Sequence, residues 1–450
     1  MSGKETLVSG VYGRQILDRR GNPMVEAEVT LRSGASGRAA VPSGASKKSW
    51  EPGKPRDGGE RWGGTGVMRA IDHVNGPIAA ALRGIDALDQ YAVDDVLLEA
   101  DGTPSKERFG ANAILGASLA TAKAAAMSQT LPLWEWLAAE REPVIPVPLI
   151  NVLIGGAHAN HEPIAKEFMI VPCGASTFSE ALRHGLEVLR ALRSLPRERG
   201  LSTALYDARG FAPDIERDHE TLDSFTEAIS AAGYIPGADV WIALDPAAST
   251  FFDGARYTSH DGLALEPREL VSYWTELVDA YPIISLEDGM AKDDCEGWQE
   301  LTRSLGARMQ LIGDDLFLTN TDLLRRGIDR GVANSILIKP DQIGTISETL
   351  DTIKLARDNG YTAVISDRSG ETEDTAIAHL AVASGCGQIK ADGPSRATGV
   401  CTYNELLRIE EATGGLARFP SRHALRPTEG SPDDDRALTS RGTSARGRAP

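Results

Sequence analysis

Three acidic residues end short apolar runs in the second half of this sequence. They are Asp245 after VWIAL, Glu287 after PIISL and Asp314 after MQLIG. Hard oxygen ligands that converge in this way suit Mg²⁺, with water and substrate oxygens completing an octahedron. For any single acid the structural alternative is that it caps a helix or pairs with a surface lysine. Three such acids in consecutive units favour a metal site.

Two lysines and an arginine end further apolar runs of the same kind. Lys339 follows SILI, Lys390 follows GQI, and Arg368 follows YTAVISD, with Ser369 next in the chain. The lysines could simply extend their ammonium groups to solvent, but beside a dication a lysine is more readily neutral and can act as a base. An arginine fork with a hydroxyl suits a phosphate. The set fits proton abstraction α to the carboxylate of a phosphorylated acid, because metal ions and cations stabilise the charge that develops.

The elements that must position these side chains form a regular pattern beyond residue 235. Six short apolar runs end in polar residues and alternate with helix-like stretches. In one of these stretches, Thr345 and Glu348 have capping-box spacing and Gly360 is the stop. Strands that alternate with helices imply a parallel sheet covered by helices, and six units in a row predict a (βα) barrel. The residues just past the strand ends should therefore face one active site.

The first third of the chain follows a different pattern. Residues 25–31 alternate between apolar and polar and predict a half-buried antiparallel strand, whereas the alanine-rich stretch 111–129 predicts a buried helix. Pro132 and the segment 142–150 mark a change of pattern. Residues 425–450 are rich in Gly, Ser, Pro and Arg, which is typical of a disordered tail. We expect an N-terminal domain, a barrel domain and a tail, with bounds 1–138, 139–424 and 425–450.

Composition and charge limit the classes of function. The chain has 450 residues, 41% hydrophobic and 25% charged, as in ordinary globular proteins. Its net charge of −17 argues against nucleic-acid binding, although local cations and a metal still permit anionic substrates. Four scattered cysteines without CxxC spacing indicate a reducing cytoplasm, and neither a signal peptide nor a run of about 18 apolar residues is visible. We expect a cytoplasmic protein whose partners are small anions, not nucleic acid or membrane.

Specific motifs occur along most of the chain, and they include DRRGNP, VPSGAS, FGANAILGASLATAKA, GGAHA, EFMIVP, SLEDG, GDDLFLTN, ANSILIKPDQIG, DRSGETEDT, GQIK and NELLRIEE. Through these motifs the sequence resembles the enolase (phosphopyruvate hydratase) family from about residue 11 to 420. The resemblance implies an α/β fold class, with a small α+β N-terminal domain packed on a modified (β/α)8 TIM-type barrel. It also implies homodimers or larger homo-oligomers, two Mg²⁺ ions, and interconversion of 2-phosphoglycerate and phosphoenolpyruvate.

The resemblance assigns roles to the metal and proton-transfer residues by their position. The implied metal contacts all offer oxygen and are Asp245, Glu287, Asp314 and Ser46. Lys339 matches the base that takes the α-proton, and Lys390 matches the lysine at the substrate carboxylate. His158 and Glu167 match pocket residues and complete the catalytic candidates.

The implied substrate-binding residues include both matches and departures. Arg368 and Ser369 match the residues that hold the phosphate. Asp367 stands where the family carries histidine, and Lys47 and Lys48 stand where it carries a Thr-Gly pair. We expect these three to contact the substrate as well. Elsewhere in the chain, aspartate replaces the family's asparagine at Asp341.

The largest departure falls in the segment TALYDARGFAP, residues 203–213. The family reads Gly-Asp-Glu-Gly-Gly where this chain reads Tyr-Asp-Ala-Arg-Gly, so that Ala208 replaces a glutamate. That glutamate is implicated in general-acid assistance as the 3-hydroxyl leaves, and loss of a positioned acid typically costs about 10²–10⁴-fold in rate. The entrance also gains cations, which suit a second anionic reactant, at Lys47, Lys48, Lys166 and Arg209.

These departures leave three functions open. We expect first a repurposed enolase-like enzyme that transfers a Mg²⁺-held three-carbon enol in phosphonate or secondary-metabolite biosynthesis. The carboxyphosphonoenolpyruvate synthase of phosphonate-antibiotic pathways is of this type, and its second substrate is nucleotide-activated. The alternative is a glycolytic enolase in which Glu167 or Asp207 substitutes for the missing acid. The third is a catalytically inactive binding or scaffold paralogue, including a copy that has drifted out of use.

Overall fold

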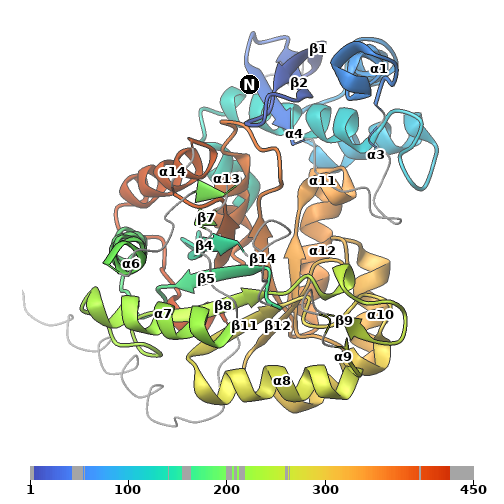
Figure 1. Cartoon of the computed structure of the whole chain (residues 1–450). Helices are drawn as coiled ribbons and strands as arrows, with labels where there is room; N and C mark the ends of the chain where they lie inside the picture. Colours follow the sequence, from blue (N-terminus) through green and yellow to red (C-terminus); the bar gives the residue numbers. More distant parts are fainter. Residues whose placement is uncertain are drawn as a thin grey trace, which may run out of the picture.

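The computed structural model describes most of the chain in two connected parts (Figure 1). The described residues are 5–42, 54, 56–139, 141–154, 164–198, 205–206, 210–211, 218–258, 262, 264–394 and 397–425. The expected tail beyond residue 425 lies outside them. The N-terminal part sits against one side of a strand barrel whose outer surface is covered by helices. No helix of the described chain is long and apolar enough to cross a membrane.

The N-terminal part is a three-stranded antiparallel sheet packed on one helix. Strands β1 (Val8–Leu17), β2 (Pro23–Leu31) and β3 (Ser36–Val41) pair in that order, and α4 (Ala111–Ser128) packs on β2 and β3. The predicted strand and the predicted buried helix are both confirmed, because alternate apolar residues of β2 and nearly all of α4 are buried. The remaining elements of this part are η1 (Arg61–Gly64), α1 (Met68–His73), η2 (Val74–Ile78), α2 (Ala79–Leu82), α3 (Gln90–Asp101) and α5 (Leu133–Ala138).

The second part is a closed barrel, which confirms the expected fold class. Its strands are β4 (Val147–Ile154), β5 (Glu167–Val171), β8 (Trp241–Asp245), β11 (Ile283–Glu287), β12 (Gln310–Gly313), β13 (Ser335–Ile338), β14 (Thr362–Ser366) and β15 (Gln388–Ala391). They pair in the order β15-β14-β13-β12-β11-β8-β5-β4, and β15 pairs with β4 to close the ring. The strands β8, β11, β12, β13, β14 and β15 are the six that the apolar runs predicted.

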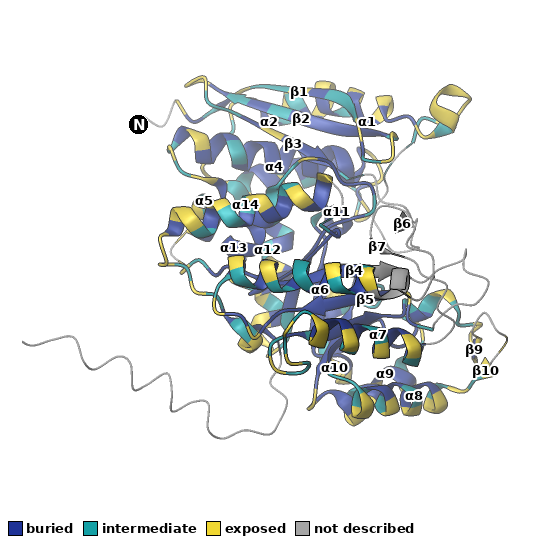
Figure 2. Ribbon diagram, turned by 60° about the vertical axis from the view of Figure 1, so that its left-hand side comes forward, coloured by how far each residue is buried: buried dark blue, intermediate teal, exposed yellow. Residues whose placement is uncertain are grey.

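Helices surround the barrel, and most of them have one face buried and the other exposed, whereas the helices at Pro340–Ile343 and Ala376–Ser384 contain no exposed residue (Figure 2). They are α6 (Phe178–Glu198), α7 (Asp218–Ala231), α8 (Pro267–Ala280), α9 (Cys295–Leu305), α10 (Thr321–Arg330), α11 (Pro340–Ile343), α12 (Ile346–Asp358), α13 (Ala376–Ser384) and α14 (Ala397–Thr413). Shorter elements are β6 (Leu205–Tyr206), β7 (Gly210–Phe211), η3 (Ala248–Thr250), β9 (Tyr257–Thr258), β10 (Ala264–Leu265) and η4 (Ser421–Ala424). Large apolar side chains on the inner helix faces, such as Trp274 and Trp298, are fully buried.

The start of α12 forms a modified version of the predicted capping box. The Thr345 hydroxyl oxygen accepts the Glu348 backbone N–H at 3.2 Å, as expected of an N-cap. The Glu348 carboxylate accepts the Thr345 hydroxyl at 2.7 Å and the Lys106 ammonium at 2.9 Å. Lys106 therefore draws the glutamate into an ion pair with the N-terminal part. The helix ends at Asp358, and Gly360, with φ 73°, ends this segment as predicted.

One strand departs from the expected parallel arrangement. Strand β5 runs antiparallel to both β4 and β8, with Glu167 directly opposite Asp245. A reversed strand begins at the mouth where its parallel neighbours end. The first residue of β5, Glu167, is therefore placed at the same mouth as the last residue of β8. The alternation of strands and helices beyond residue 235 does not reveal this reversal, because β5 lies before it.

Strand β3 approaches α4 so closely at Gly37 that no side chain fits there, and a substitution can test this requirement for glycine. A Cβ on Gly37 would lie 2.2 Å from the Ala120 carbonyl oxygen and 2.3 Å from the Ala124 nitrogen. We predict that Gly37→Ala lowers the free energy of unfolding by about 1–3 kcal/mol or more, because backbone must move to admit the methyl group. Gly10→Ala in β1 is the matched control, since a Cβ there meets nothing within 4 Å. Equal urea midpoints for the two variants would contradict the prediction.

Candidate active site

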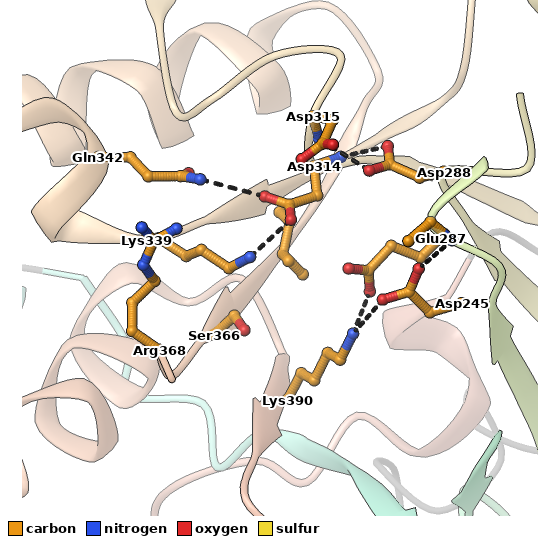
Figure 3. Close-up of polar contacts among 12 residues, drawn as sticks. Asp245, Glu287, Asp288, Asp314, Asp315, Lys339, Gln342, Ser366, Arg368 and Lys390 are labelled. Atoms are coloured by element: carbon orange, nitrogen blue, oxygen red, sulfur yellow. Dashed lines mark hydrogen bonds and ion pairs between the residues drawn. The ribbon is translucent and has the colours of Figure 1, made fainter. Parts of the chain in front are cut away.

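Three carboxylates meet one ammonium group at the mouth of the barrel, and two of them, Asp245 and Glu287, are labelled beside Lys390 in Figure 3. Lys390 Nζ lies 2.7 Å from Glu287 Oε2 and 3.1 Å from both Asp245 Oδ2 and Glu167 Oε2. All four side chains are buried. The adjacent parallel strands β8 and β11 bring Asp245 and Glu287 together at their ends, and β15 carries Lys390 toward them from across the mouth. The structure thus brings together four of the predicted site residues.

A second lysine and carboxylate form a pair beside this group. Lys339 Nζ donates to Asp314 Oδ2 at 2.6 Å, and Gln342 Nε2 donates to Asp314 Oδ1 at 3.3 Å. The Thr319 hydroxyl donates to the Gln342 amide oxygen at 3.1 Å and accepts the Lys339 backbone N–H at 2.8 Å. This chain of hydrogen bonds fixes both the base candidate and its acidic partner at the ends of β13 and β12.

The mouth holds more acidic than basic groups. Four carboxylates (Glu167, Asp245, Glu287 and Asp314) face two ammonium groups (Lys339 and Lys390), which leaves a formal charge of −4 + 2 = −2. Burial, and next the charge of Asp245, raise the pKa of Glu287 well above its usual range. Burial alone would lower the pKa of Lys390, but the surrounding carboxylates raise it well above its usual value. A buried set of hard oxygen donors in which carboxylates outnumber ammonium groups fits Mg²⁺.

In a neighbouring group of acids, Asp288 has a structural role. Asp288, Asp314 and Asp315 bring carboxylate oxygens within 4.8 Å of one another. However, Asp288 Oδ1 and Oδ2 accept the backbone N–H groups of Asp314 and Asp315, both at 2.9 Å. With both oxygens engaged in this way, Asp288 holds the loop after β12 against the end of β11. We therefore assign the ligand role to Asp245, Glu287 and Asp314 as a proposal and treat Asp288 as a positioning residue.

The expected phosphate end of the site contains an unforeseen acid. Arg368 Nε lies 3.0 Å from Asp341 Oδ2, and the same oxygen pairs with the ammonium group of Lys54. Arg368 and Asp367 are buried, and Ser369 follows them half-buried. The Asp367 backbone N–H donates to the Lys390 carbonyl oxygen at 3.0 Å, which ties the ends of β14 and β15 together. The expected phosphate residues therefore lie at the same mouth as the metal candidates.

Several predicted residues lie outside the described part of the chain. These are the metal candidate Ser46, the substrate candidates Lys47 and Lys48, the catalytic candidate His158, and the departures at Asp207, Ala208 and Arg209. They remain predictions from the sequence alone.

Two residues of the site escaped the sequence analysis. Asn151 Nδ2 donates to Glu167 Oε2 at 2.9 Å, and Gln342 contacts Asp314. The sequence does contain a signal for each of these two residues. Asn151 is an amide within the otherwise apolar run PVPLINVLI, and Gln342 lies three residues after Lys339, in the short helix that begins at Pro340. Neither signal indicates which carboxylate the amide contacts.

Comparison with known proteins matches both parts of the chain. Residues 8–137 match the family model described as "Enolase, N-terminal domain", and residues 142–428 match "Enolase, C-terminal TIM barrel domain". The chain is also 51% identical over 424 residues to a protein named "Enolase" from Rubrobacter xylanophilus. The aligned region covers 94% of this chain and 99% of that protein.

The crowded carboxylates predict a strong dependence of stability on Lys390. In EDTA, we expect Lys390→Met to lower the free energy of unfolding in urea by about 3–5 kcal/mol, because it leaves buried carboxylates without their shared cation. Added Mg²⁺ should restore part of the loss. Lys354→Met, which breaks an exposed pair with Asp358, is the control and should change nothing measurable. Equal stability of the two variants in EDTA would count against the assigned electrostatics.

Proposed function

The chain belongs to the enolase family, and from that premise we propose that it dehydrates 2-phosphoglycerate to phosphoenolpyruvate with Mg²⁺ as cofactor. The observation that carries the proposal is the convergence of three strand-end carboxylates with Lys339 and Lys390 at one buried mouth. The identity to a protein named Enolase, over almost the whole length of both chains, supports the same reaction.

The carboxylates would hold the metal, and the lysines would act on the substrate. We assign the first Mg²⁺ to Asp245, Glu287 and Asp314, and a second to the segment that contains Ser46. Bound there, Mg²⁺ would stabilise the negative charge that builds up on the substrate carboxylate. Lys390, already surrounded by carboxylates in this structure, is placed to bind the same substrate group.

Lys339 would remove the proton α to the carboxylate. Its ammonium group is buried and held by Asp314, so a metal on that carboxylate would weaken its hold on the lysine proton. Arg368 and Ser369 would bind the phosphate, with Asp367 beside them. We assign Lys47, Lys48 and His158 to the rim of the pocket from their sequence positions.

The acid that assists departure of the hydroxyl must differ from the family's glutamate, which Ala208 replaces. Glu167 is a mouth carboxylate outside the proposed metal set, and Lys390 and Asn151 hold it in place. We propose Glu167 as the substitute acid, with Asp207 as the alternative.

The comparisons favour dehydration over the enol-transfer function expected first. That expectation depended on Ala208, Asp367 and the added cations, and no comparison gives support to phosphonate biosynthesis or a nucleotide-activated substrate. We accordingly propose a small three-carbon acid as substrate. Family membership also supports a homo-oligomer, and the four free cysteines support a reducing compartment such as the cytoplasm.

The proposal predicts direct turnover of 2-phosphoglycerate. With Mg²⁺, phosphoenolpyruvate absorbance should rise with kcat on the order of 10 per second, a typical enzyme value. Chelation of the metal should abolish the rise. Absence of turnover with Mg²⁺ would refute dehydration, and release of CMP from CMP-phosphonoformate plus a three-carbon acid would support enol transfer.

The double variant Ala208→Glu with Asp367→His serves as the comparison protein in the same assay. It restores the two family residues and should raise kcat by about tenfold or more if a positioned acid assists hydroxide departure.

A further inference from the structure

A buried aspartate forms ion pairs with two cations of the proposed phosphate site. Asp341 is 1% exposed, and its Oδ2 lies 3.0 Å from Arg368 Nε and pairs also with the ammonium group of Lys54. Asp341 and Arg368 line one pocket together with Ser366 and Pro42. Asp341 and Arg368 therefore border a small, mostly apolar hollow between α4 of the N-terminal part and the helices α11 and α13 of the barrel part.

The cluster carries less positive charge than its cations suggest. Arg368 and Lys54 contribute +2 and Asp341 contributes −1, and the buried Asp367 next to Arg368 lowers the local charge further. Burial opposes ionisation of Asp341, but Arg368 and Lys54 outweigh it and hold the pKa of that carboxyl below its usual value. Burial, and next Asp367, raise the pKa of the neighbouring Glu371 to about 8, so Glu371 adds little charge at neutral pH.

We propose that Asp341 is a specificity-determining residue that weakens the preference of this site for a doubly charged group over a singly charged one. The inference rests on the proposed function, because it takes Arg368 as the phosphate-binding residue. Attraction to the cluster scales with the product of the two charges, so the charge of Asp341 costs a dianion about twice the free energy that it costs a monoanion. The ligand class that the charge of Asp341 disfavours least is a tetrahedral monoanion, such as a singly protonated phosphoryl or phosphonate group.

The shape of the cluster permits a clean substitution. Among the described residues, no hydrogen-bond donor reaches Asp341 Oδ1. In Asp341→Asn the side-chain oxygen can still accept from Lys54 and remain next to Arg368 Nε, and the amide nitrogen takes the place of Oδ1. The variant removes one negative charge while the shape and the contacts to both cations stay the same.

Sulfate and perchlorate form the matched pair of probes, because both are tetrahedral and differ in charge. Their dissociation constants are measured by isothermal titration calorimetry at fixed ionic strength on the full-length protein with Mg²⁺. We expect Asp341→Asn to tighten perchlorate binding by about 3- to 10-fold and sulfate binding by about the square of that factor, on the order of 10- to 100-fold. A purely structural ion pair would change both anions alike or neither.

Two further variants complete the test. Glu348→Gln removes an acid that also pairs with a lysine of the N-terminal part, Lys106, and should change neither anion by more than about twofold. Lys54→Gln lowers the cluster charge by one and should weaken sulfate more than perchlorate. Its side chain is 12% exposed, and this variant decides the question if Asp341→Asn fails to fold.

The outcomes separate the inference from the proposed function. Equal effects on sulfate and perchlorate in folded Asp341→Asn, or in Lys54→Gln, overturn the inference even if 2-phosphoglycerate is turned over. A selective gain for sulfate supports the inference even in a protein that fails to dehydrate 2-phosphoglycerate, because the binding measurement needs no turnover.

Discussion

The structure depends on an electrostatic constraint at the barrel mouth, where four buried carboxylates share two ammonium groups. Such crowding is unfavourable unless cations compensate it, and the raised pKa of Glu287 reflects this cost. The same crowding favours a hard divalent cation, because a dication supplies positive charge that the two ammonium groups do not. The crowded carboxylates therefore lower the stability of the metal-free protein and raise its affinity for the metal.

Strands and hydrogen bonds hold the mouth carboxylates in place, and both parts of the chain contribute charged groups near them. The reversal of β5 delivers Glu167 to the mouth opposite Asp245, and the Thr319–Gln342 hydrogen bonds hold Asp314. Lysines of the N-terminal part also reach barrel acids, in the pairs Lys54–Asp341, Lys106–Glu348 and Lys123–Asp374. These pairs join the two parts and place one N-terminal lysine in the proposed phosphate site.

The sequence could predict what local pattern determines. Six barrel strands, the metal-ligand candidates at three of their ends, and both lysines follow from apolar runs that stop at polar residues. The reversal of β5 could not be predicted in this way, because a short buried run such as EFMIV does not indicate whether the strand lies parallel or antiparallel to its neighbours. The contact of Asp341 with Arg368 joins the start of α11 to the end of β14 and depends on tertiary structure. The preference for enol transfer gave too much weight to Ala208, whereas the comparisons weigh the whole chain.

The central claim is that Lys339 removes the proton α to a metal-held carboxylate, and hydrogen exchange at C2 of 2-phosphoglycerate tests it most directly. Exchange with D₂O is followed by proton NMR in the presence of Mg²⁺, for the parent protein and for Lys339→Met. The account predicts loss of the C2 proton signal with the parent and, with Lys339→Met, no loss beyond that in buffer. Exchange at the parental rate in the variant, or none in the parent with Mg²⁺, would contradict it.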